Sequence, residues 1–175
     1  LSVTSLAENL KVSYNTVRSW LDILERFYLT FSLPTWTGKI ARAIQKEKKY
    51  YLFDHARIRD DAAKFENMMA CELWRVVTLW NDLGLAEFSL HFIRDKEKRE
   101  VDFLVVKDGE PFLLIEAKLS DAQPAKPLVA FQNNLRIPAV QLTSNGKGYR
   151  VIPNGENKIL IAPAWQWLAG LPGKY

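Results

Sequence analysis

Two short apolar segments open the pattern of hydrophobic and polar positions along the chain. Residues 4–10 form the first segment, and residues 14–27 form the second after a break at residues 11–13. Apolar side chains in the second segment recur at helical spacing: Val17, Trp20, Leu21, Ile23, Leu24 and Phe27. Ser13 stands in front of it as a capping residue. Two helices joined by a three-residue turn are typical of the helix-turn-helix.

The next pattern indicates a two-stranded ribbon. Residues 28–33 and 50–53 are rich in aromatic and β-branched residues, which favour strands. The segment between them, residues 36–49, is rich in Lys and Arg. A helix-turn-helix followed by a ribbon with a basic tip predicts a winged helix over residues 1–55.

The pattern changes again in residues 56–175, which we expect to form a second domain. A long amphipathic helix is predicted at residues 62–83, with shorter helices at 128–134 and 163–171. Strands are predicted at 87–93, 101–106, 112–118, 139–142 and 158–161, with a turn at residues 145–146. This mixture predicts an α+β or α/β fold.

Composition narrows the class of protein. The chain has 175 residues, of which 48% are hydrophobic and 25% are charged, as in a folded globular protein. Its net charge of +4 permits a polyanionic partner without requiring one. A single cysteine, Cys71, forms no disulfide within the chain. No apolar run is long enough for a membrane span and no signal peptide opens the chain, so we expect a cytoplasmic protein.

Three charged residues stand inside the predicted strands at 101–106 and 112–118. They are Asp102, Glu116 and Lys118, and a buried charge is costly unless it is paired. If the turn between the strands is a three-residue loop centred on Gly109, Asp102 lies directly opposite Glu116. A two-residue turn would instead put Asp102 on the other face of the sheet. Two facing carboxylates with Lys118 beside them predict a site for Mg²⁺ or Mn²⁺.

These residues resemble a known signature. Asp102, followed on the next strand by Ile115-Glu116-Ala117-Lys118, is similar to the motif of the PD-(D/E)XK nuclease superfamily, which has the restriction-endonuclease-like fold and a mixed central sheet. The family's proline before the aspartate is Val101 here. The resemblance implies that Asp102 and Glu116 hold the metal ion and that Lys118 assists the attacking water.

A third metal ligand in that superfamily often comes from the preceding helix. Glu66 is the best match here, and Glu72 is the second. Gln132 matches a supporting position on the following helix more weakly. The ordinary alternative for the whole motif is a salt bridge between Glu116 and Lys118 on a strand pair without metal or catalysis.

The resemblance extends over almost the whole chain to the C-terminal half of a prokaryotic family of AAA-type ATPases. The resemblance rests on the winged-helix pattern and on Glu100-Val101-Asp102-Phe103. It also rests on residues 51–54, 65–67, 72–73 and 115–118. No phosphate-binding G-x-x-x-x-G-K-[ST] motif occurs in this chain. Because it also starts at Leu1, we expect an N-terminal ATPase domain of the same polypeptide to be missing.

Two classes of function remain open. One is metal-dependent cleavage of DNA. The other is a non-catalytic DNA-binding or protein-docking module that regulates the ATPase domain. Candidate phosphate contacts lie on the second helix and on the ribbon: Arg18, Lys39, Arg42, Lys46, Lys48 and Lys49. The two histidines, His55 and His91, lack cysteine partners at zinc spacing, so we expect them to be structural.

Overall fold

The computed structural model of the chain describes residues 3–38, 48–120 and 123–171. Its helices are α1 (Val3–Leu10), α2 (Tyr14–Arg26), α3 (Asp61–Asp82), α4 (Lys126–Leu135) and α5 (Ala164–Ala169), with a short 3-10 helix at His55–Arg57. Its strands are β1 (Thr30–Pro34), β2 (Lys48–Leu52), β3 (Phe88–Arg94), β4 (Glu100–Lys107), β5 (Glu110–Lys118), β6 (Ala139–Thr143), β7 (Arg150–Asn154) and β8 (Asn157–Pro163). The mixture of helices and a six-stranded sheet confirms the predicted α+β class.

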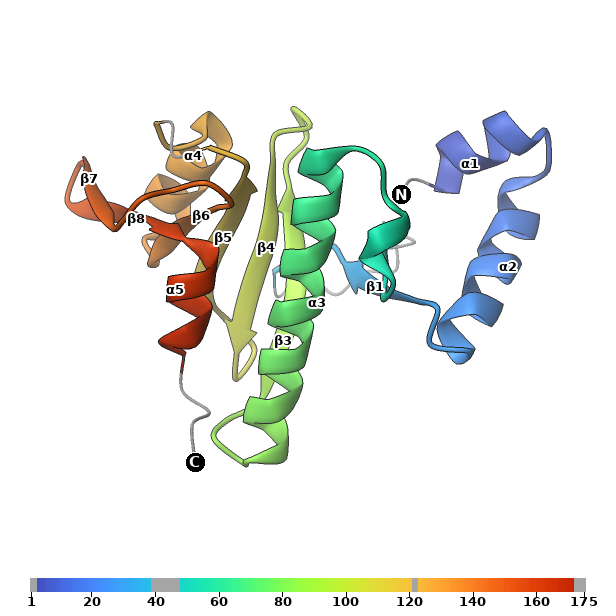
Figure 1. Cartoon of the computed structure of the whole chain (residues 1–175), viewed down its shortest axis with the longest axis horizontal. Coiled ribbons are helices and arrows are strands. Elements are labelled where there is room, and N and C mark those ends of the chain that lie inside the picture. The colour runs from blue at the N-terminus through green and yellow to red at the C-terminus, as the bar shows by residue number, and fades with distance from the viewer. Residues whose placement is uncertain (1–2, 39–47, 121–122, 172–175) are drawn as a thin grey trace.

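A mixed sheet forms the centre of the molecule (Figure 1). Its strand order is β3-β4-β5-β6-β8-β7. The pairs β5–β6 and β6–β8 are parallel, and the other neighbours are antiparallel. The connection between β5 and β6 contains α4, which packs on one face of the sheet, whereas the connection between β6 and β8 contains the edge strand β7.

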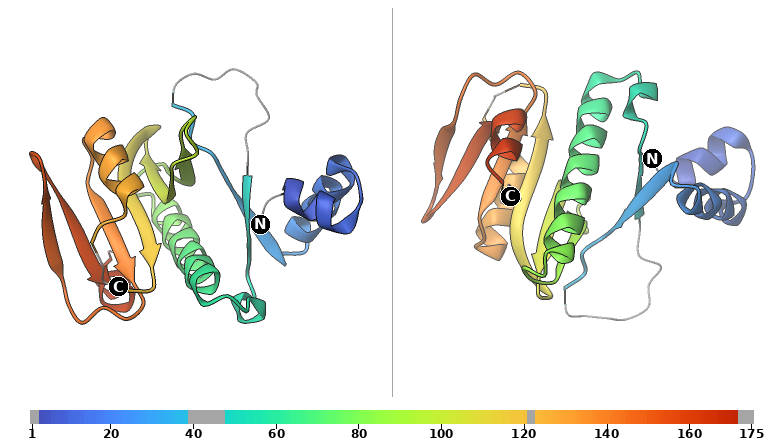
Figure 2. Two further views of the ribbon diagram at one scale, coloured as in Figure 1. Left: turned by 90° about the horizontal axis from the view of Figure 1, so that it is seen from above. Right: turned by 60° about the horizontal axis from the view of Figure 1, so that its bottom comes forward.

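The two faces of the sheet carry separate apolar cores. On one face α3 packs through residues such as Met69 and Leu73 against Phe103 and Ile115. On the other face α4 packs through Leu128 and Phe131 against a second set of strand residues. The views from two further directions show α3 and α4 on opposite sides of the strands (Figure 2).

The ribbon of β1 and β2 belongs to the main core. Phe31, Leu33 and Tyr51 are buried there beside α3. Trp36 N donates to the backbone oxygen of Phe92 on β3 at 2.8 Å. The ribbon therefore packs against the six-stranded domain, and it does not project away from it.

Helices α1 and α2 lie beyond the ribbon at one end of the molecule (Figures 1 and 2). They form a small third core with Tyr50 of β2, in which Val17 and Leu21 are the buried residues of α2. The Ser13 cap is confirmed, because its hydroxyl accepts from the backbone nitrogen of Thr16 at 3.0 Å. Half of the apolar face predicted for this helix stays exposed, since Trp20, Ile23 and Phe27 are not covered.

One strand was not predicted from the sequence. The edge strand β7 contains Pro153 and pairs antiparallel with β8 through a turn at Gly155 and Glu156. Proline is tolerated at a sheet edge, where its missing N–H removes no necessary ladder bond. Pro153 inside a segment of only five residues concealed this strand in the sequence pattern.

Candidate functional site

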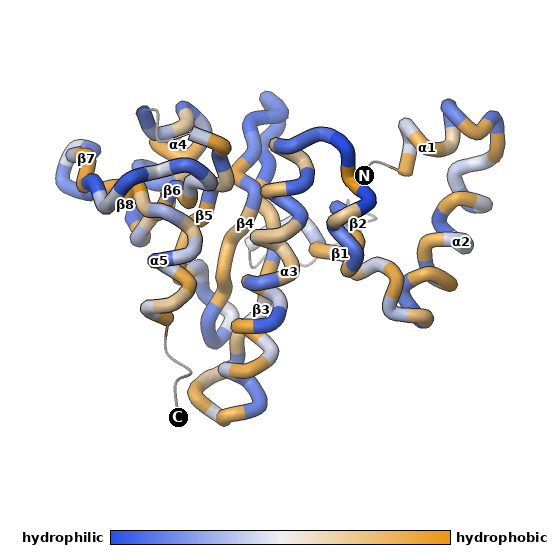
Figure 3. Tube along the Cα trace, viewed as in Figure 1, coloured by the Kyte–Doolittle hydropathy of each residue, from blue (hydrophilic) through white to orange (hydrophobic). Residues whose placement is uncertain are grey.

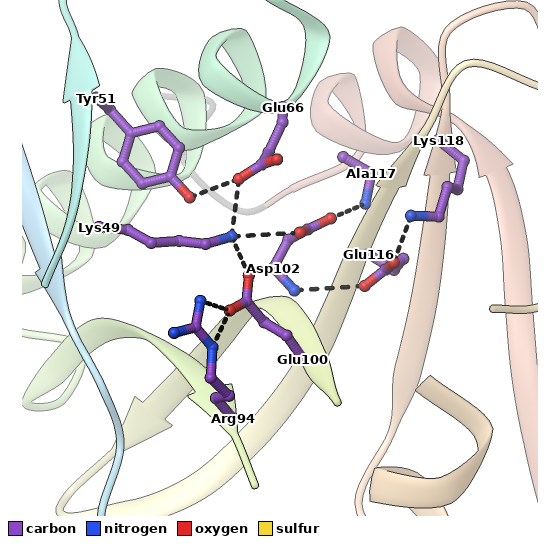
Figure 4. A network of polar contacts seen from close by, with 9 residues as sticks. All are labelled: Lys49, Tyr51, Glu66, Arg94, Glu100, Asp102, Glu116, Ala117 and Lys118. Atoms are coloured by element: carbon purple, nitrogen blue, oxygen red, sulfur yellow. Dashed lines mark hydrogen bonds and ion pairs between the residues drawn. The ribbon is translucent and has the colours of Figure 1, made fainter. Parts of the chain in front are cut away.

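Four carboxylates from three elements meet near the end of the pairing between β4 and β5. They are Glu66 of α3, Glu100 and Asp102 of β4, and Glu116 of β5, which together we name the carboxylate site. Figure 4 shows that two lysines reach it from opposite directions, Lys49 from β2 and Lys118 from β5. The sequence prediction grouped Glu66, Asp102, Glu116 and Lys118, and the structure does bring these side chains into one region.

The carboxylate site lies where the ladder between β4 and β5 ends. Phe103 pairs with Ile115 in the last regular position. Beyond it, the backbone nitrogen of Asp102 donates to Glu116 Oε2 at 3.3 Å, and that of Ala117 donates to Asp102 Oδ2 at 3.1 Å. The two carboxylates therefore accept backbone N–H groups that would otherwise bond carbonyls of the opposite strand.

The turn of this hairpin differs from the prediction. Asp108 and Gly109 form a two-residue turn between the paired residues Lys107 and Glu110. Both turn residues have positive φ, 50° and 81°, which is the geometry of a type I′ turn with its preferred Asp-Gly sequence. The prediction of a three-residue loop centred on Gly109 was wrong.

A β-bulge nevertheless restores the predicted register. Val105 pairs with Leu113, whereas Val106 pairs with Pro111, so Phe112 is an extra residue in β5. This single residue shifts the pairing by one position between the turn and the carboxylate site. Asp102 therefore meets Glu116 although the turn is one residue shorter than the prediction required.

Lys118 is a local partner of the site. Its ammonium lies 2.6 Å from Glu116 Oε1, two residues earlier on the same strand. The Glu116 side chain is almost fully buried, whereas that of Lys118 is 47% exposed. Burial raises the pKa of Glu116, and the Lys118 ammonium opposes that rise.

Lys49 is a long-range partner of the site and is more deeply buried. Its ammonium lies 2.5 Å from Glu100 Oε1, 3.0 Å from Glu66 Oε1 and 3.5 Å from Asp102 Oδ1. The side chain is only 17% exposed. Burial would lower the pKa of Lys49, but the charges of the three carboxylates outweigh it and raise the pKa above its usual value.

Two further side chains hold the carboxylates in place. The Tyr51 hydroxyl donates to Glu66 Oε1 at 2.8 Å. Arg94 Nε donates to Glu100 Oε2 at 2.6 Å, and Arg94 Nη2 contacts the same oxygen. Burial, followed by the charge of Glu66, raises the pKa of Tyr51, so its hydroxyl stays a proton donor.

Asp102 has the most perturbed carboxyl group of the site. Burial, followed by the negative charges of Glu116 and Glu66, raises its pKa to about 7. Lys49 and the backbone N–H of Ala117 act in the opposite direction without cancelling the rise. A carboxyl with a pKa near neutrality changes its charge in the ordinary working range of a protein.

As arranged, the carboxylate site does not fit a divalent cation. Over residues 3–38, 48–120 and 123–171, no group of three or more acidic, histidine or cysteine side chains has a geometry that could hold a metal ion. The ammonium of Lys49 lies among three of the four carboxylates, including the predicted ligands Glu66 and Asp102. Three cationic side chains, Lys49, Lys118 and Arg94, contact the four carboxyl groups.

The other predicted site residues lie elsewhere. Glu72, the second choice for the helical carboxylate, pairs with Arg75 on the exposed side of α3. Gln132 bonds the backbone oxygens of Ile137 and Lys158 and has a structural role in the α4 region.

The predicted nucleic-acid contacts do not form one described surface. Lys39, Arg42 and Lys46 lie outside the described residues. Arg18 is exposed on α2, and the ammonium of Lys48 lies 3.9 Å from Glu25. Lys49, which the sequence placed at a phosphate-binding tip, contacts carboxylates instead.

With the geometry described, comparison with known proteins identifies the family. Residues 62–165 match the family described as a domain of unknown function, DUF4143. The chain belongs to the DUF4143 family. Residues 1–60 match a second family, also described as a domain of unknown function, DUF8612. No curated protein and no solved structure matches the chain.

The carboxylate site and the side chains that contact it come from both matched ranges. All four carboxylates belong to the DUF4143 range, whereas Lys49 and Tyr51 belong to the DUF8612 range. A further contact joins the two ranges nearby, because the Asn67 side chain accepts from the backbone nitrogen of Leu52 at 2.9 Å and donates to its oxygen at 2.6 Å. Side chains of the DUF4143 helix α3 thus bond both the backbone and the side chains of strand β2.

Four members of the network were missing from the predicted site: Lys49, Tyr51, Arg94 and Glu100. Two of them left a signal in the sequence. Glu100 is two residues before Asp102 on a predicted strand boundary, and Lys49 is two residues before Tyr51. Such spacing places both members of each pair on one side of an extended segment.

None of the helices in the described residues combines the length and apolar character that a membrane span requires.

Proposed function

We propose that this chain is the C-terminal portion of a cytoplasmic prokaryotic AAA-type ATPase, where it serves as a non-catalytic protein-docking module that regulates the ATPase domain. Membership of DUF4143 supports the first part, because this domain is typically found in proteins associated with AAA-type ATPases. In this proposal residues 1–55 are a winged helix and residues 56–175 a restriction-endonuclease-like domain. The order of helices and ribbon, followed by a mixed sheet with helices on both faces, supports that division.

The observation that carries the non-catalytic part is the position of Lys49. Its ammonium, from the range of residues 1–60, contacts three carboxylates that all lie in the range of residues 62–165. A charged group held by partners in this way stabilises a fixed arrangement when all its hydrogen bonds are satisfied. The carboxylate site thus acts as a joint between the N-terminal region and the DUF4143 domain.

The exposed face of α2 favours a protein partner over DNA. Trp20, Ile23 and Phe27 lie at spacings of three and four residues, which places them along one side of the helix. Figure 3 shows apolar residues along this helix and the turn after it, and Phe27 is 72% exposed. A helix that enters the major groove presents polar and basic side chains to the base edges, whereas an apolar stripe is suited to a protein surface.

The full-length polypeptide with its ATPase domain provides the test. Phe27→Ser removes the most exposed side chain of the stripe, and Trp165→Ser is a matched control, because Trp165 on α5 is 67% exposed. We expect Phe27→Ser to change the rate of ATP hydrolysis at least about threefold, since exposed aromatic contacts often carry the energy of an interface. The control should retain the wild-type rate. Equal rates in all three proteins would contradict regulation through α2.

A second candidate function is metal-dependent cleavage of phosphodiester bonds in DNA. The meeting of Asp102 and Glu116, with Lys118 bonded to Glu116, favours it. In this candidate the two carboxylates and Glu66 would hold Mg²⁺ or Mn²⁺. Lys118 would stabilise negative charge that develops on the phosphate. The arrangement of Glu66 and Lys49 would have to change before such an ion could bind.

A cleavage assay separates the two candidates. Plasmid DNA is incubated with the protein and Mg²⁺ or Mn²⁺, and the wild type is compared with Lys118→Ala and with Lys107→Ala, a lysine at the far end of β4. Nicking that only Lys118→Ala abolishes would establish cleavage and overturn the non-catalytic proposal. Intact plasmid in every reaction supports the docking module.

A further inference from the structure

We infer that the Lys49 ammonium takes the place that a divalent cation would need, so that the carboxylate site binds a metal ion only when Lys49 leaves it. The inference concerns regulation of the same site and rests on the second candidate function, which requires metal there. It makes Lys49 an internal competitor supplied by the region before the DUF4143 domain.

The hydrogen-bonding capacity of Lys49 is fully matched. An ammonium has three N–H donors and no acceptor. Glu66, Glu100 and Asp102 each place one oxygen within 3.5 Å of Nζ. Glu66 Oε1 and Asp102 Oδ1, which belong to two of the three predicted metal ligands, are therefore directed at the ammonium.

A second cation cannot share this position. Two positive charges a few ångströms apart repel each other strongly where water is largely excluded, and the Lys49 side chain is mostly buried. Without Lys49, the four carboxylates would face only Lys118 and Arg94. Carboxylate oxygens with excess negative charge are the ligands that Mg²⁺ and Mn²⁺ prefer.

Lys49 is able to leave without dismantling the ribbon. The backbone of Leu52 is held by the side-chain amide of Asn67, and Tyr51 is held to Glu66 through its hydroxyl. None of these bonds uses the Lys49 side chain. A lysine side chain has a flexible stem of four carbons, so rotation of that stem opens the site while β2 remains on α3.

The test measures Mn²⁺ binding to three proteins by electron paramagnetic resonance of the free ion. They are the wild type, Lys49→Met and the control Lys48→Met, which removes a neighbouring exposed lysine and the same charge. We expect Lys49→Met to bind about tenfold to a hundredfold more tightly than the wild type, the range over which outer-shell groups change metal affinity. Lys48→Met should bind as the wild type does.

The other outcomes of the Mn²⁺ binding experiment distinguish failure of the inference from failure of the cleavage candidate. Equal affinity in wild type and Lys49→Met would overturn the inference and leave the cleavage candidate standing. No binding in any of the three proteins would overturn both, because removal of Lys49 would have created no metal site. Tighter binding by Lys49→Met without plasmid cleavage would support the inference and contradict only the cleavage candidate.

A measurement on the wild type keeps the inference testable if Lys49→Met does not fold. The side-chain ¹⁵N resonance of the Lys49 ammonium is followed by nuclear magnetic resonance while diamagnetic Mg²⁺ is added. Lys49 should lose its three carboxylate partners as the ion binds, so its resonance should move toward that of an exposed lysine. Mg²⁺ binding with an unchanged Lys49 resonance would contradict the competition.

Discussion

Lys49 and Lys118 approach the carboxylate site from opposite sides and pair with different carboxylates, and they also differ in how they are held. Lys118 binds Glu116 within one strand, and about half of its side chain is exposed. Lys49 binds three carboxylates on α3 and β4, and it is mostly buried. The comparison separates a local ion pair from a tertiary one. The Lys118 pair lies within a single strand, whereas the Lys49 pairs join elements that are distant in sequence.

Removal of Lys49 tests this distinction with the largest expected effect. Lys49→Met should lower the free energy of unfolding by about 3 kcal/mol at pH 8, because it leaves buried carboxylates without their cation. Urea unfolding in the presence of a chelator measures the loss. Lys48→Met, on the exposed neighbour, should change stability by less than about 1 kcal/mol. Equal effects of the two changes would show that Lys49 is no more than a surface lysine.

The pH dependence of the free energy of unfolding should reveal the contribution of Asp102. Its pKa is raised to about 7 in the folded protein, against about 3.9 in an unfolded chain. The folded state therefore holds a proton that the unfolded state has released, so stability falls as the pH rises from about 4 through 7. The slope should reach at most about 1.4 kcal/mol per pH unit.

Asp102→Asn should flatten that slope in the metal-free protein, whereas Asp82→Asn, at an exposed carboxyl on α3, should preserve it. Chemical denaturation at a series of pH values provides the measurement. A wild-type stability that falls no more steeply between pH 4 and 7 than that of Asp102→Asn would contradict the assigned direction of the Asp102 pKa.

The smallest effect is expected for Lys118→Ala. Because its partner lies two residues away on one strand and its own side chain is half exposed, the loss of stability should be about 1 kcal/mol or less. The same change should raise the pKa of Glu116 further, since the ammonium that lowers it is gone. A carboxyl ¹³C titration checks the shift, and a stability loss as large as that of Lys49→Met would abolish the contrast between the two lysines.

The contrast also explains what the sequence could predict. The Glu116–Lys118 contact follows from strand alternation and was anticipated as the ordinary alternative to a metal site. The contact of Lys49 with Glu100 and Glu66 depends on how the ribbon packs against α3, which no local pattern encodes. The same limit applies to α2, where helical periodicity predicted one apolar face but could not tell that Trp20 and Phe27 stay uncovered.

The hairpin of β4 and β5 has the predicted pairing of Asp102 with Glu116, but the predicted three-residue turn that was to produce it is absent. The Asp108-Gly109 sequence is a clear signal for a two-residue turn. The bulge at Phe112 has a weaker signal in its neighbour Pro111, because proline in a central strand is typical of a bulge, whereas Phe112 itself fits a regular strand. Only the three-dimensional pairing shows that the two deviations cancel before the strands reach Asp102.

Because the short turn and the bulge cancel, the contact between Asp102 and Glu116 depends on whether the number of residues between the two strands' paired positions is odd or even. Between Phe103 and Ile115, an insertion or deletion of one residue would exchange inward and outward positions and separate Asp102 from Glu116, while the sheet itself could still form. A change of two residues would merely lengthen or shorten the arm. The contact between Asp102 and Glu116 therefore depends less on which residues lie between Phe103 and Ile115 than on whether their number is odd or even. A family member that differs there by one residue should be examined first for a compensating bulge.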